Sequence, residues 1–370
     1  MQILAINCGS SSLKFAIVDT TEGRHLLGGL EELGGSNHAR ALDAVLARVE
    51  AERGSLAAIG HRVVHGGEAF RASVRIDARV LKNIEALCDL APLHNPANLL
   101  AIRRLRTAFP ELPQVAVFDT AFHQSLPPHA YLYALPRSLH RDHGIRRYGF
   151  HGTSHRYVAE EATGRFDLCP ENGRIVTAHL GNGCSTAAVL GGRCVDTSMG
   201  FSPLEGLVMG TRSGDVDPGL HHFLGRRLQL DPDAISDLLN RKSGLLGLSE
   251  LSGDMRELER AETEGHEGAA LAIEIFCYRL AGQIARHLVA LGGLDALILT
   301  GGIGENSSRV RGRVMEWLAP LGFELDAEKN ARHGSDSGGR ISCGGPPLAA
   351  VISTDEERLI ASETAAVLIN

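Results

Sequence analysis

Blocks of apolar residues with two different spacings follow one another along the chain. Short apolar runs predict strands, and they lie at residues 2–19 (a pair), 57–64, 112–118, 175–179, 187–190, 295–300 and 348–352. Apolar residues at helical spacing predict helices at 41–53, 84–90, 98–108 and 267–291, one from about 307 and a last one to 368. Strands that alternate with helices indicate an α/β fold.

The longest helical stretch, 267–291, carries Phe276 and Leu280 on one face, and Gly292 is its stop signal. Glu274 and Arg279 interrupt it, so we do not expect it to span a membrane. The first residues lack the basic and apolar regions of a secretory signal, which favours a cytoplasmic protein.

Two glycine-containing turns lie between apolar runs in the two halves of the chain. Residues 5–17 read AINCGSSSLKFAI, and residues 177–190 read TAHLGNGCSTAAVL. When the two segments are aligned, Asn7 falls on His179 and Gly9 on Gly181. Repetition at this scale suggests a duplicated fold with a cleft between the copies. Turns rich in N–H groups and hydroxyls suit phosphate, although an ordinary surface hairpin with a polar tip is the alternative.

The chain has 370 residues, a formal net charge of −7 and seven cysteines. This length favours two or three domains. The negative charge argues against binding to nucleic acid or to a membrane surface, which needs basic patches. The cysteines form no C-x-x-C pair, so neither a disulfide framework nor a zinc site is indicated, and a reducing cytosol is expected. Cys8 and Cys184 lie in the glycine turns, where a small residue or a nucleophile are the alternatives.

Familiar catalytic motifs are absent from the sequence: there is no P-loop, no G-x-G-x-x-G after a strand and no G-x-S-x-G. Polar segments instead follow the predicted strands, and they lie at 61–68, 91–96, 118–120, 149–155, 203–214 and 300–306. Ligands bind beyond the carboxyl ends of strands in open α/β sheets. A lone Arg or His is usually structural, but six such segments together favour an active site.

Several of these segments carry a resemblance to a known family. Residues 7–15 (NCGSSSLKF) and 149–155 (GFHGTSH) resemble the two signature segments of the acetate kinase family. Residues 179–183 (HLGNG), 210–215 (GTRSGD) and 301–306 (GGIGEN) extend the resemblance, which covers about residues 3–365.

The resemblance implies a duplicated two-domain actin-like ATPase fold of the sugar kinase, heat-shock protein and actin superfamily, with the active-site cleft between the domains. It implies an N-terminal domain at 1–122 plus 357–370 and a C-terminal nucleotide-binding and dimerisation domain at 123–356. The implied activity is reversible transfer of the γ-phosphoryl group of ATP to acetate, which gives acetyl phosphate and ADP. Mg²⁺ is the implied metal, with Mn²⁺ as a substitute, and a cytoplasmic homodimer that serves acetyl-CoA biosynthesis is expected.

The resemblance also assigns roles to individual residues. The implied catalytic residues are Arg62, Asp119, His151 and Arg212. The implied metal ligands are Asn7 and Glu356. The implied acetate-binding residues are Arg62, Val64, Leu93, Phe150 and Pro203. The implied nucleotide contacts are Ser10, Ser12, Lys14, His179, Leu180, Gly181, Asn182, Gly183, Asp254, Met255, Arg256, Gly302, Ile303, Gly304, Glu305 and Asn306.

Three alternatives stay open at this point. The resemblance implies that Asp119 is an acid/base, but a small carboxylic acid has a pKa near ~4 and its anion needs no base at neutral pH. We therefore expect Asp119 to position Mg²⁺ or Arg212. A propionate or broader short-chain carboxylate kinase is an alternative activity, because one methylene discriminates by only ~1–3 kcal/mol. A nucleotide-binding protein without turnover is another alternative, and the presence of Arg62, His151 and Arg212 argues against it.

Overall fold

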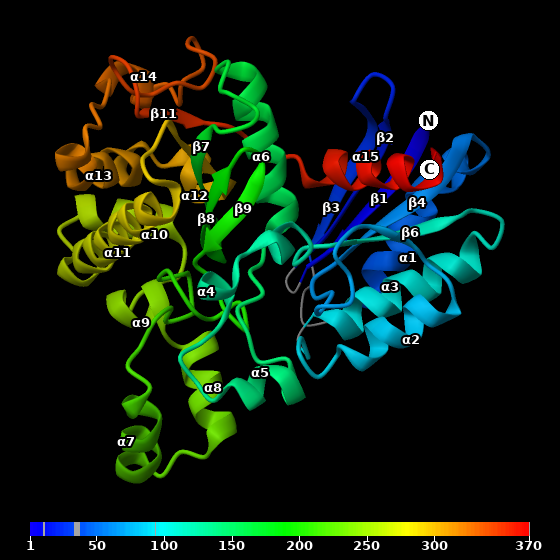
Figure 1. Ribbon diagram of the computed structural model, residues 1–370, viewed down its shortest axis with the longest axis horizontal. Helices are drawn as coiled ribbons and strands as arrows, with labels where there is room; N and C mark the ends of the chain where they lie inside the picture. Colours follow the sequence, from blue (N-terminus) through cyan, green and yellow to red (C-terminus); the bar gives the residue numbers. More distant parts are fainter. Residues whose placement is uncertain (10–11, 33–37, 93, 370) are drawn as a thin grey trace. The chain divides into compact units, whose positions relative to one another are not determined.

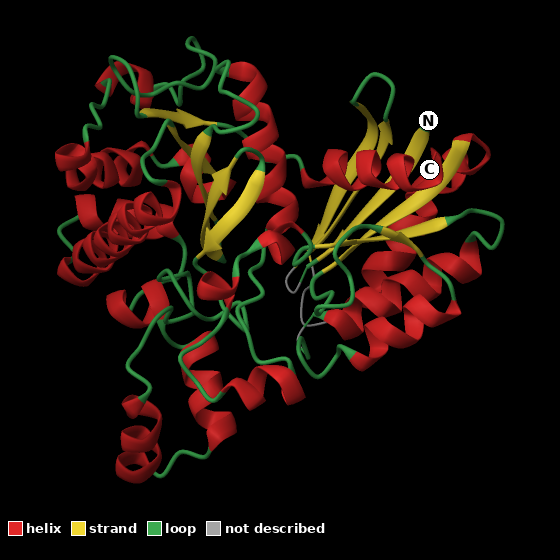
Figure 2. Cartoon of the chain, in the orientation of Figure 1, coloured by secondary structure: helices red, strands yellow, loops and turns green. Residues whose placement is uncertain are grey.

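The computed structural model describes residues 1–9, 12–32, 38–92 and 94–369. These residues form two compact units (Figure 1). The first unit contains residues 1–124, 150–157 and 355–370, and the second contains residues 125–149 and 158–354. Each unit is built around one β-sheet (Figure 2). The functional domain boundaries expected from the sequence stay a prediction.

The first unit contains a six-stranded sheet with the order β3-β2-β1-β4-β6-β5. Its strands are β1 (Gln2–Cys8), β2 (Ser12–Asp19), β3 (Arg24–Glu32), β4 (Leu56–Val63), β5 (Val74–Arg75) and β6 (Gln114–Phe118). β1 pairs antiparallel with β2, and Asn7 lies opposite Lys14. β1 also pairs parallel with β4, which pairs parallel with β6. The carboxyl ends of β1, β4 and β6 therefore lie at one edge of the sheet.

Helices cover both faces of this sheet (Figure 1). α1 (His38–Val49) and α3 (Asn95–Ala108) pack on the face that carries Leu4 and Phe15. α15 (Glu356–Ile369) packs on the opposite face, against Ile3 and Val18. Neighbouring residues of a strand point to opposite faces, so a nearly continuous apolar strand such as β1 supplies both layers of core. The remaining helices near this sheet are α2 (Ala78–Ala86), η1 (Glu50–Ser55) and η2 (Phe122–Ser125).

The second unit contains a five-stranded sheet with the order β11-β10-β7-β8-β9. Its strands are β7 (Arg174–Leu180), β8 (Cys184–Leu190), β9 (Arg193–Thr197), β10 (Ala296–Thr300) and β11 (Leu348–Val351). β7 pairs antiparallel with β8 and parallel with β10, and β10 pairs parallel with β11. β7, β8, β9, β10 and β11 thus repeat the order and directions of β1, β2, β3, β4 and β6. The predicted duplication of the fold is confirmed.

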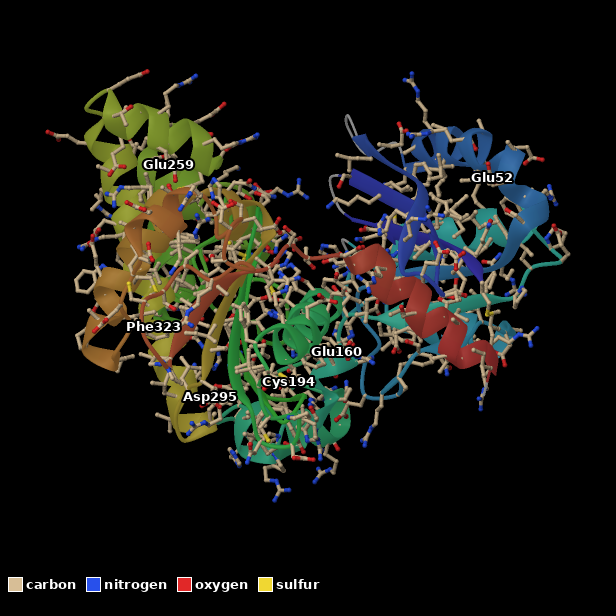
Figure 3. The ribbon with its side chains drawn as sticks, turned by 90° about the horizontal axis from the view of Figure 1, so that it is seen from above. Glu52, Glu160, Cys194, Glu259, Asp295 and Phe323 are labelled. Atoms are coloured by element: carbon tan, nitrogen blue, oxygen red, sulfur yellow. The ribbon has the colours of Figure 1, made fainter. Side chains whose placement is uncertain are left out.

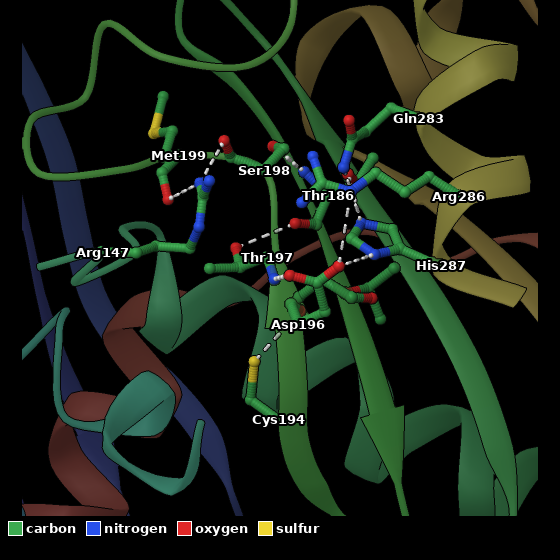
Figure 4. A network of polar contacts seen from close by, with 12 residues as sticks. Arg147, Thr186, Cys194, Asp196, Thr197, Ser198, Met199, Gln283, Arg286 and His287 are labelled. Carbon is green, nitrogen blue, oxygen red and sulfur yellow. Dashed lines mark hydrogen bonds and ion pairs between the residues drawn. The ribbon is translucent and has the colours of Figure 1, made fainter. Parts of the chain in front are cut away.

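The longest helix, α11 (Glu267–Leu291), packs on the second sheet through apolar residues and a buried polar network (Figure 4). His287 Nε2 lies 2.8 Å from Thr186 Oγ1, and His287 Nδ1 lies 3.2 Å from Asp196 Oδ2. Within the described residues, α11 is the one helix that could cross a membrane by length and composition alone. Its buried face includes Ile273, Phe276, Leu280 and Ile284, which places it as a core helix of this unit.

Shorter helices surround the second sheet or lie between its strands in sequence. They are α4 (Pro128–Tyr131), α5 (Arg137–His143), α6 (Gly152–Arg165), α7 (Gly219–Leu228), α8 (Pro232–Arg241), α9 (Gly244–Ser249), α10 (Met255–Thr263), α12 (Gly301–Asn306), α13 (Ser308–Leu318), η3 (Ala319–Leu321) and α14 (Ala327–Ala331). Side chains fill the space between these elements (Figure 3).

Many elements differ from the sequence prediction, which left out β3, β5, β9, the helices α4 to α10, α12 and α14. β3 contains Gly28 and Gly29, and β9 (Arg193–Thr197) carries the polar residues Arg193, Asp196 and Thr197, so neither forms an apolar run. α2 begins at Ala78 rather than at 84, because Asp77 caps its first turn by accepting a hydrogen bond from Val80 N.

Candidate active site

Polar side chains from four elements meet at the carboxyl edge of the first sheet. Arg62 is the penultimate residue of β4, and Asp119 directly follows β6. Asn7 lies near the end of β1, and Glu356 begins α15. All four residues were predicted to be functional, and the structure brings them into one hydrogen-bonded cluster, as expected for strand ends in an α/β sheet.

Arg62 and Asp119 form a bidentate ion pair. Arg62 Nε donates to Asp119 Oδ1 over 2.9 Å, and Arg62 Nη2 donates to Asp119 Oδ2. Thr153 Oγ1 also donates to Asp119 Oδ1 over 3.0 Å. The Asp119 side chain is fully buried, while 11% of the Arg62 side chain is exposed. Planar bidentate pairs fix the orientation of both partners, so Asp119 holds the guanidinium group of Arg62 in one place.

Asn7 connects this ion pair to two carboxylates. Its Oδ1 accepts a hydrogen bond from Arg62 Nη1 over 3.0 Å. Its Nδ2 donates to Glu356 Oε2 over 2.6 Å and to Glu357 Oε1 over 2.9 Å. Burial opposes the charge of Arg62, but Asp119, Glu356 and Glu357 outweigh it and raise the pKa of Arg62 above its usual value. Burial and the neighbouring Glu356 raise the pKa of Glu357.

The oxygen-rich part of this cluster fits a magnesium ion. The carboxylates of Glu356 and Glu357 are hard oxygen donors, the type that Mg²⁺ prefers, whereas Asn7 turns its Nδ2 toward them and its Oδ1 toward Arg62. Within the described residues, no group of three or more His, Cys, Asp or Glu side chains is placed to hold a metal. Mg²⁺ is commonly held by one or two carboxylates together with substrate phosphates, so this donor set is compatible with it.

The turn from Phe150 to Thr153 is pressed against Asp119. His151 has a φ of 56°, which is unusual for a residue with a side chain. A Cβ atom on Gly152 would lie 1.9 Å from Asp119 O, so only glycine fits there. His123 Nε2 donates to Phe150 O over 3.0 Å, and burial lowers the pKa of His123 to about 4. The strained turn therefore fixes where the His151 backbone lies relative to Asp119.

The other predicted residues of the first unit that the structure describes are Ser12, Lys14, Val64 and Phe150. Lys14 is exposed and lies opposite Asn7 in the β1–β2 hairpin, and Ser12 begins β2. Val64 and Phe150 are buried, which fits a core position as well as the predicted acyl site. Ser10 and Leu93, which were also predicted, lie outside the described residues.

The second unit contains a pocket of about 740 Å³. It is lined by Gly181, Asn182, Gly253, Asp254, Met255, Arg256, Glu259, Gly302, Ile303, Asn306 and Ser307. Glu259, which is labelled in Figure 3, is a lining residue from α10. The volume lies within the range of about 300–1,000 Å³ that is typical of small-molecule sites. Eight predicted nucleotide contacts are thus brought together from the β7–β8 turn, the start of α10 and α12.

Charged groups stand at the α10 side of this pocket. Asp254 caps α10 by accepting a hydrogen bond from Arg256 N over 2.9 Å. The side chain of Arg256 pairs with Asp254, and this hydrogen bond lowers the pKa of Asp254. The Arg256 side chain is 88% exposed, so its guanidinium group is accessible to a ligand.

Five other predicted residues do not line the pocket: His179, Leu180, Gly183, Gly304 and Glu305. The carboxylate of Glu305 instead ties the backbone together, because its Oε1 accepts hydrogen bonds from Gly301 N over 3.0 Å and from Thr354 N over 3.3 Å. These residues shape the strand ends on which the pocket is built.

Arg212 and Pro203 contact each other within the second unit. Arg212 Nη1 donates to Pro203 O over 3.0 Å and lies 3.7 Å from Met209 Sδ. Burial lowers the pKa of Arg212. Within the described residues Arg212 forms no ion pair.

Sequence reasoning missed three residues that contact the predicted ones. Glu357 shares Asn7 with Glu356, and Thr153 binds Asp119. Asn98 joins two strand ends, since its Nδ2 donates to Cys8 O over 2.9 Å and its Oδ1 accepts from Val64 N over 3.1 Å. The sequence shows only an Asn within a helical stretch, and the role of Asn98 becomes visible through its burial, with 1% of it exposed.

The two turn cysteines have the properties of structural residues. Burial raises the pKa of Cys8 to about 11 and that of Cys184 to about 12. Both are therefore neutral thiols at physiological pH and poor nucleophiles. This supports the small-residue alternative over a nucleophilic role.

Comparisons with known proteins agree along nearly the whole chain. The model of the acetokinase family matches residues 31–362. The acetate kinase of Stutzerimonas stutzeri (strain A1501) is 54% identical, over 99% of this chain and 98% of that protein. The solved structure of a propionate kinase from Francisella tularensis subsp. tularensis SCHU S4 has a TM-score of 0.90 and 42% identity, and 98% of each chain is covered.

A second solved structure, the acetate kinase of Porphyromonas gingivalis, has a TM-score of 0.89 and 39% identity and covers 99% of each chain. The fold and the length of these matches agree with one another. The chain belongs to the acetokinase family and is a phosphotransferase of the kinase type.

Proposed function

We propose that this chain transfers the γ-phosphoryl group of ATP to acetate, reversibly, and gives acetyl phosphate and ADP. The observation that carries the proposal is the 54% identity to an acetate kinase over 99% of this chain. The Arg62–Asp119–Asn7 cluster supports it, because phosphoryl transfer depends on positioning and on neutralising charge.

The proposed reaction needs cations more than it needs a base. Acetate is already an anion at neutral pH, since small carboxylic acids have a pKa near ~4. We assign Arg62 and Arg212 to the charge of the transferring group, because a guanidinium group offers paired donors in one plane. His151 is proposed as a hydrogen-bond donor to the same group in the transition state.

From the sequence we expected Asp119 to position Mg²⁺ or Arg212. Because its carboxylate pairs with Arg62, we propose instead that Asp119 positions Arg62 and does not transfer a proton. Its carboxylate is fully buried and is used by Arg62 and Thr153. We expect a solvent deuterium isotope effect on kcat close to one, measured with acetate and ATP at saturation. A large isotope effect on the chemical step would contradict this role.

We propose Mg²⁺ as the metal, with Mn²⁺ able to replace it, and Asn7 and Glu356 as its protein ligands. When bound, the ion neutralises phosphate oxygens of the nucleotide. Lys14, Ser10 and Ser12 are proposed to hold phosphate oxygens. The chain's own contribution is to hold oxygen atoms in place: Asn7 Nδ2 donates to Glu356 Oε2, and Arg62 Nη1 donates to Asn7 Oδ1.

We propose the α12 pocket as the nucleotide site. It is large enough for a nucleotide and contains glycines at which the backbone is open to a ligand. His179, Leu180, Gly183, Gly304 and Glu305 are proposed to contribute through the strand ends and turns that shape it.

A preference for propionate is the second candidate. The observation in its favour is the propionate kinase structure, with 42% identity. Acetate is preferred here because the curated acetate kinase relative is more similar, with 54% identity. Val64, Phe150, Leu93 and Pro203 are proposed to surround the acyl methyl group.

We also propose a cytoplasmic homodimer that serves acetyl-CoA biosynthesis, with functional domains at 1–122 plus 357–370 and at 123–356. All seven cysteines are free thiols, which suits a reducing compartment. α7 has no buried residue and exposes the apolar side chains of Leu220, Phe223 and Leu228, which supports contact with a second copy.

One substrate panel tests the proposed function. Formation of acyl phosphate is measured with ATP, Mg²⁺ and either acetate, propionate or butyrate, and kcat/KM is compared. We expect the highest value for acetate. A higher kcat/KM for propionate would favour a propionate kinase. Binding of ATP without formation of any acyl phosphate would contradict the proposal that the chain is an enzyme.

A further inference from the structure

Arg311 on α13 is the largest side chain that the fold buries completely, with an exposed fraction of 0%. A buried guanidinium group is costly unless each of its donors is used. Nε donates to Asn330 Oδ1 over 2.8 Å, and Nη2 contacts Asn330 O over 2.8 Å and His333 Nδ1 over 2.9 Å. Nη1 donates to Gly304 O over 3.0 Å and to Glu305 O over 2.9 Å.

The two carbonyl groups that Arg311 binds belong to α12, the short helix of the proposed nucleotide pocket. The last four carbonyl groups of a helix lack partners within the helix, and in α12 these include Gly304 O and Glu305 O. A cation is favourable at such an end because the carbonyl groups carry partial negative charge. Arg311 therefore fixes the end of α12 from inside the protein, while Gly302 and Ile303 of the same helix line the pocket.

No carboxylate neutralises this cation directly. Among the residues that the structure describes, Arg311 forms no ion pair, and its partners are carbonyl groups, an amide and an imidazole. Burial lowers the pKa of Arg311 to about 10, while the charge of Glu259 opposes the change, so the group stays protonated at neutral pH. A structural clamp alone does not require a net positive charge, whereas a pocket for a polyanion gains from one.

We propose that Arg311 is a positioning residue for the nucleotide: it holds α12 in the conformation that binds nucleotide phosphates. The inference rests on the proposed function, because it assigns the α12 pocket to the nucleotide. Arg311 itself is buried and does not contact the ligand. Its contacts with Asn330 and His333 anchor it to the segment around α14.

Three variants separate positioning from simple stability. Arg311→Lys keeps the charge but cannot reach Asn330, His333 and both α12 carbonyl groups at once. Asn330→Ala removes a partner on the far side of the guanidinium group and leaves the α12 bonds. Arg309→Met is the matched control, since Arg309 lies on the same helix, is 44% exposed and pairs with Glu262.

The measurements are the dissociation constant of Mg-ADP by calorimetry, the KM for acetate at saturating ATP, and the melting temperature. We expect Arg311→Lys to weaken Mg-ADP binding by about tenfold or more, as for the loss of hydrogen bonds to a charged group. The KM for acetate should change by less than about twofold. Asn330→Ala should lower the melting temperature with near-normal Mg-ADP binding, and Arg309→Met should change neither constant.

A folded Arg311→Lys protein with normal Mg-ADP affinity would overturn the proposal, and so would equal changes in both constants. Failure of Arg311→Lys to fold would also overturn it, because the residue would then serve stability. The proposed function is tested separately: if the wild-type chain binds Mg-ADP but forms no acyl phosphate, the activity is wrong while the role of Arg311 can still be measured. If it does not bind Mg-ADP, both are wrong.

Discussion

Arg62 Nε lies 2.9 Å from Asp119 Oδ1, and a second hydrogen bond of the same bidentate ion pair joins Arg62 Nη2 to Asp119 Oδ2. The pair comes from neighbouring parallel strands and lies at their carboxyl ends. The pair holds the guanidinium group of Arg62 in a fixed position, and because the Asp119 carboxylate is fully buried, its charge also contributes to the stability of the fold.

Replacement of Asp119 should therefore destabilise the protein. Asp119→Asn removes the negative charge opposite a largely buried guanidinium group, and loss of one partner of a buried pair costs about 3–5 kcal/mol. We expect a loss of about 3 kcal/mol in urea unfolding, since Glu356 and Glu357 still oppose the charge of Arg62. The control is Asp43→Asn, which breaks the exposed pair with Arg104 and should cost under about 1 kcal/mol. Equal losses in both variants would contradict the role given to this pair.

Glu357 should make stability depend on pH. Burial and Glu356 raise its pKa, so the folded chain keeps a proton that the unfolded chain has lost. Unfolding then releases a proton, and the contribution of Glu357 to stability falls as the pH rises above its ordinary pKa of 4.5. Glu357→Gln removes this loss and keeps an oxygen that accepts the hydrogen bond from Asn7.

The measurement is the melting temperature of metal-free protein between pH 4 and pH 7. We expect Glu357→Gln to exceed the wild type at pH 7 and the difference to shrink toward pH 4. Glu85→Gln, which breaks an exposed pair with Arg103, serves as the control. A variant that is less stable than the wild type at pH 7 would count against the raised pKa.

Gly152 should tolerate no side chain. Gly152→Ala places a Cβ atom 1.9 Å from Asp119 O, so either the His151 turn or the strand end must move. We expect a loss of more than about 3 kcal/mol in unfolding free energy and the loss of phosphotransfer. The control is Gly164→Ala in the same helix, where a Cβ atom meets nothing within 4 Å and should stabilise the helix by about 0.5–1 kcal/mol. A Gly152→Ala protein of normal stability would show that the contact is not rigid.

Arg212 should act on turnover more than on binding. Arg212→Ala removes a charge that no described carboxylate neutralises, and arginines that stabilise a transferring phosphoryl group contribute about 10³–10⁵ to kcat. We expect kcat to fall by about 10³-fold while Mg-ATP affinity changes little. Arg241→Ala, in an exposed pair with Asp237, is the control. Equal losses in kcat and in Mg-ATP affinity would argue against the assigned role.

The sequence predicted the elements with the clearest apolar patterns, but it left out edge strands and helices such as α6, α8 and α10. Apolar runs and turn residues predicted the β1–β2 and β7–β8 hairpins, α11 and the polar segments at the strand ends. β3 and β9 were not predicted, because edge strands need only one partner and contain polar residues or glycine. Glu357 was hidden beside Glu356, since the face of a helix that a residue joins depends on packing. Arg311 left a signal, because it shares a helical face with Met315 and Leu318, where an arginine is unexpected.

The most direct test of the proposed function is ³¹P NMR of the purified chain with ATP, Mg²⁺ and acetate. The account predicts an acetyl phosphate signal that grows together with ADP in equal amounts and disappears when acetate is left out. ADP together with inorganic phosphate, or no change in ATP under conditions where Mg-ADP binds, would contradict it.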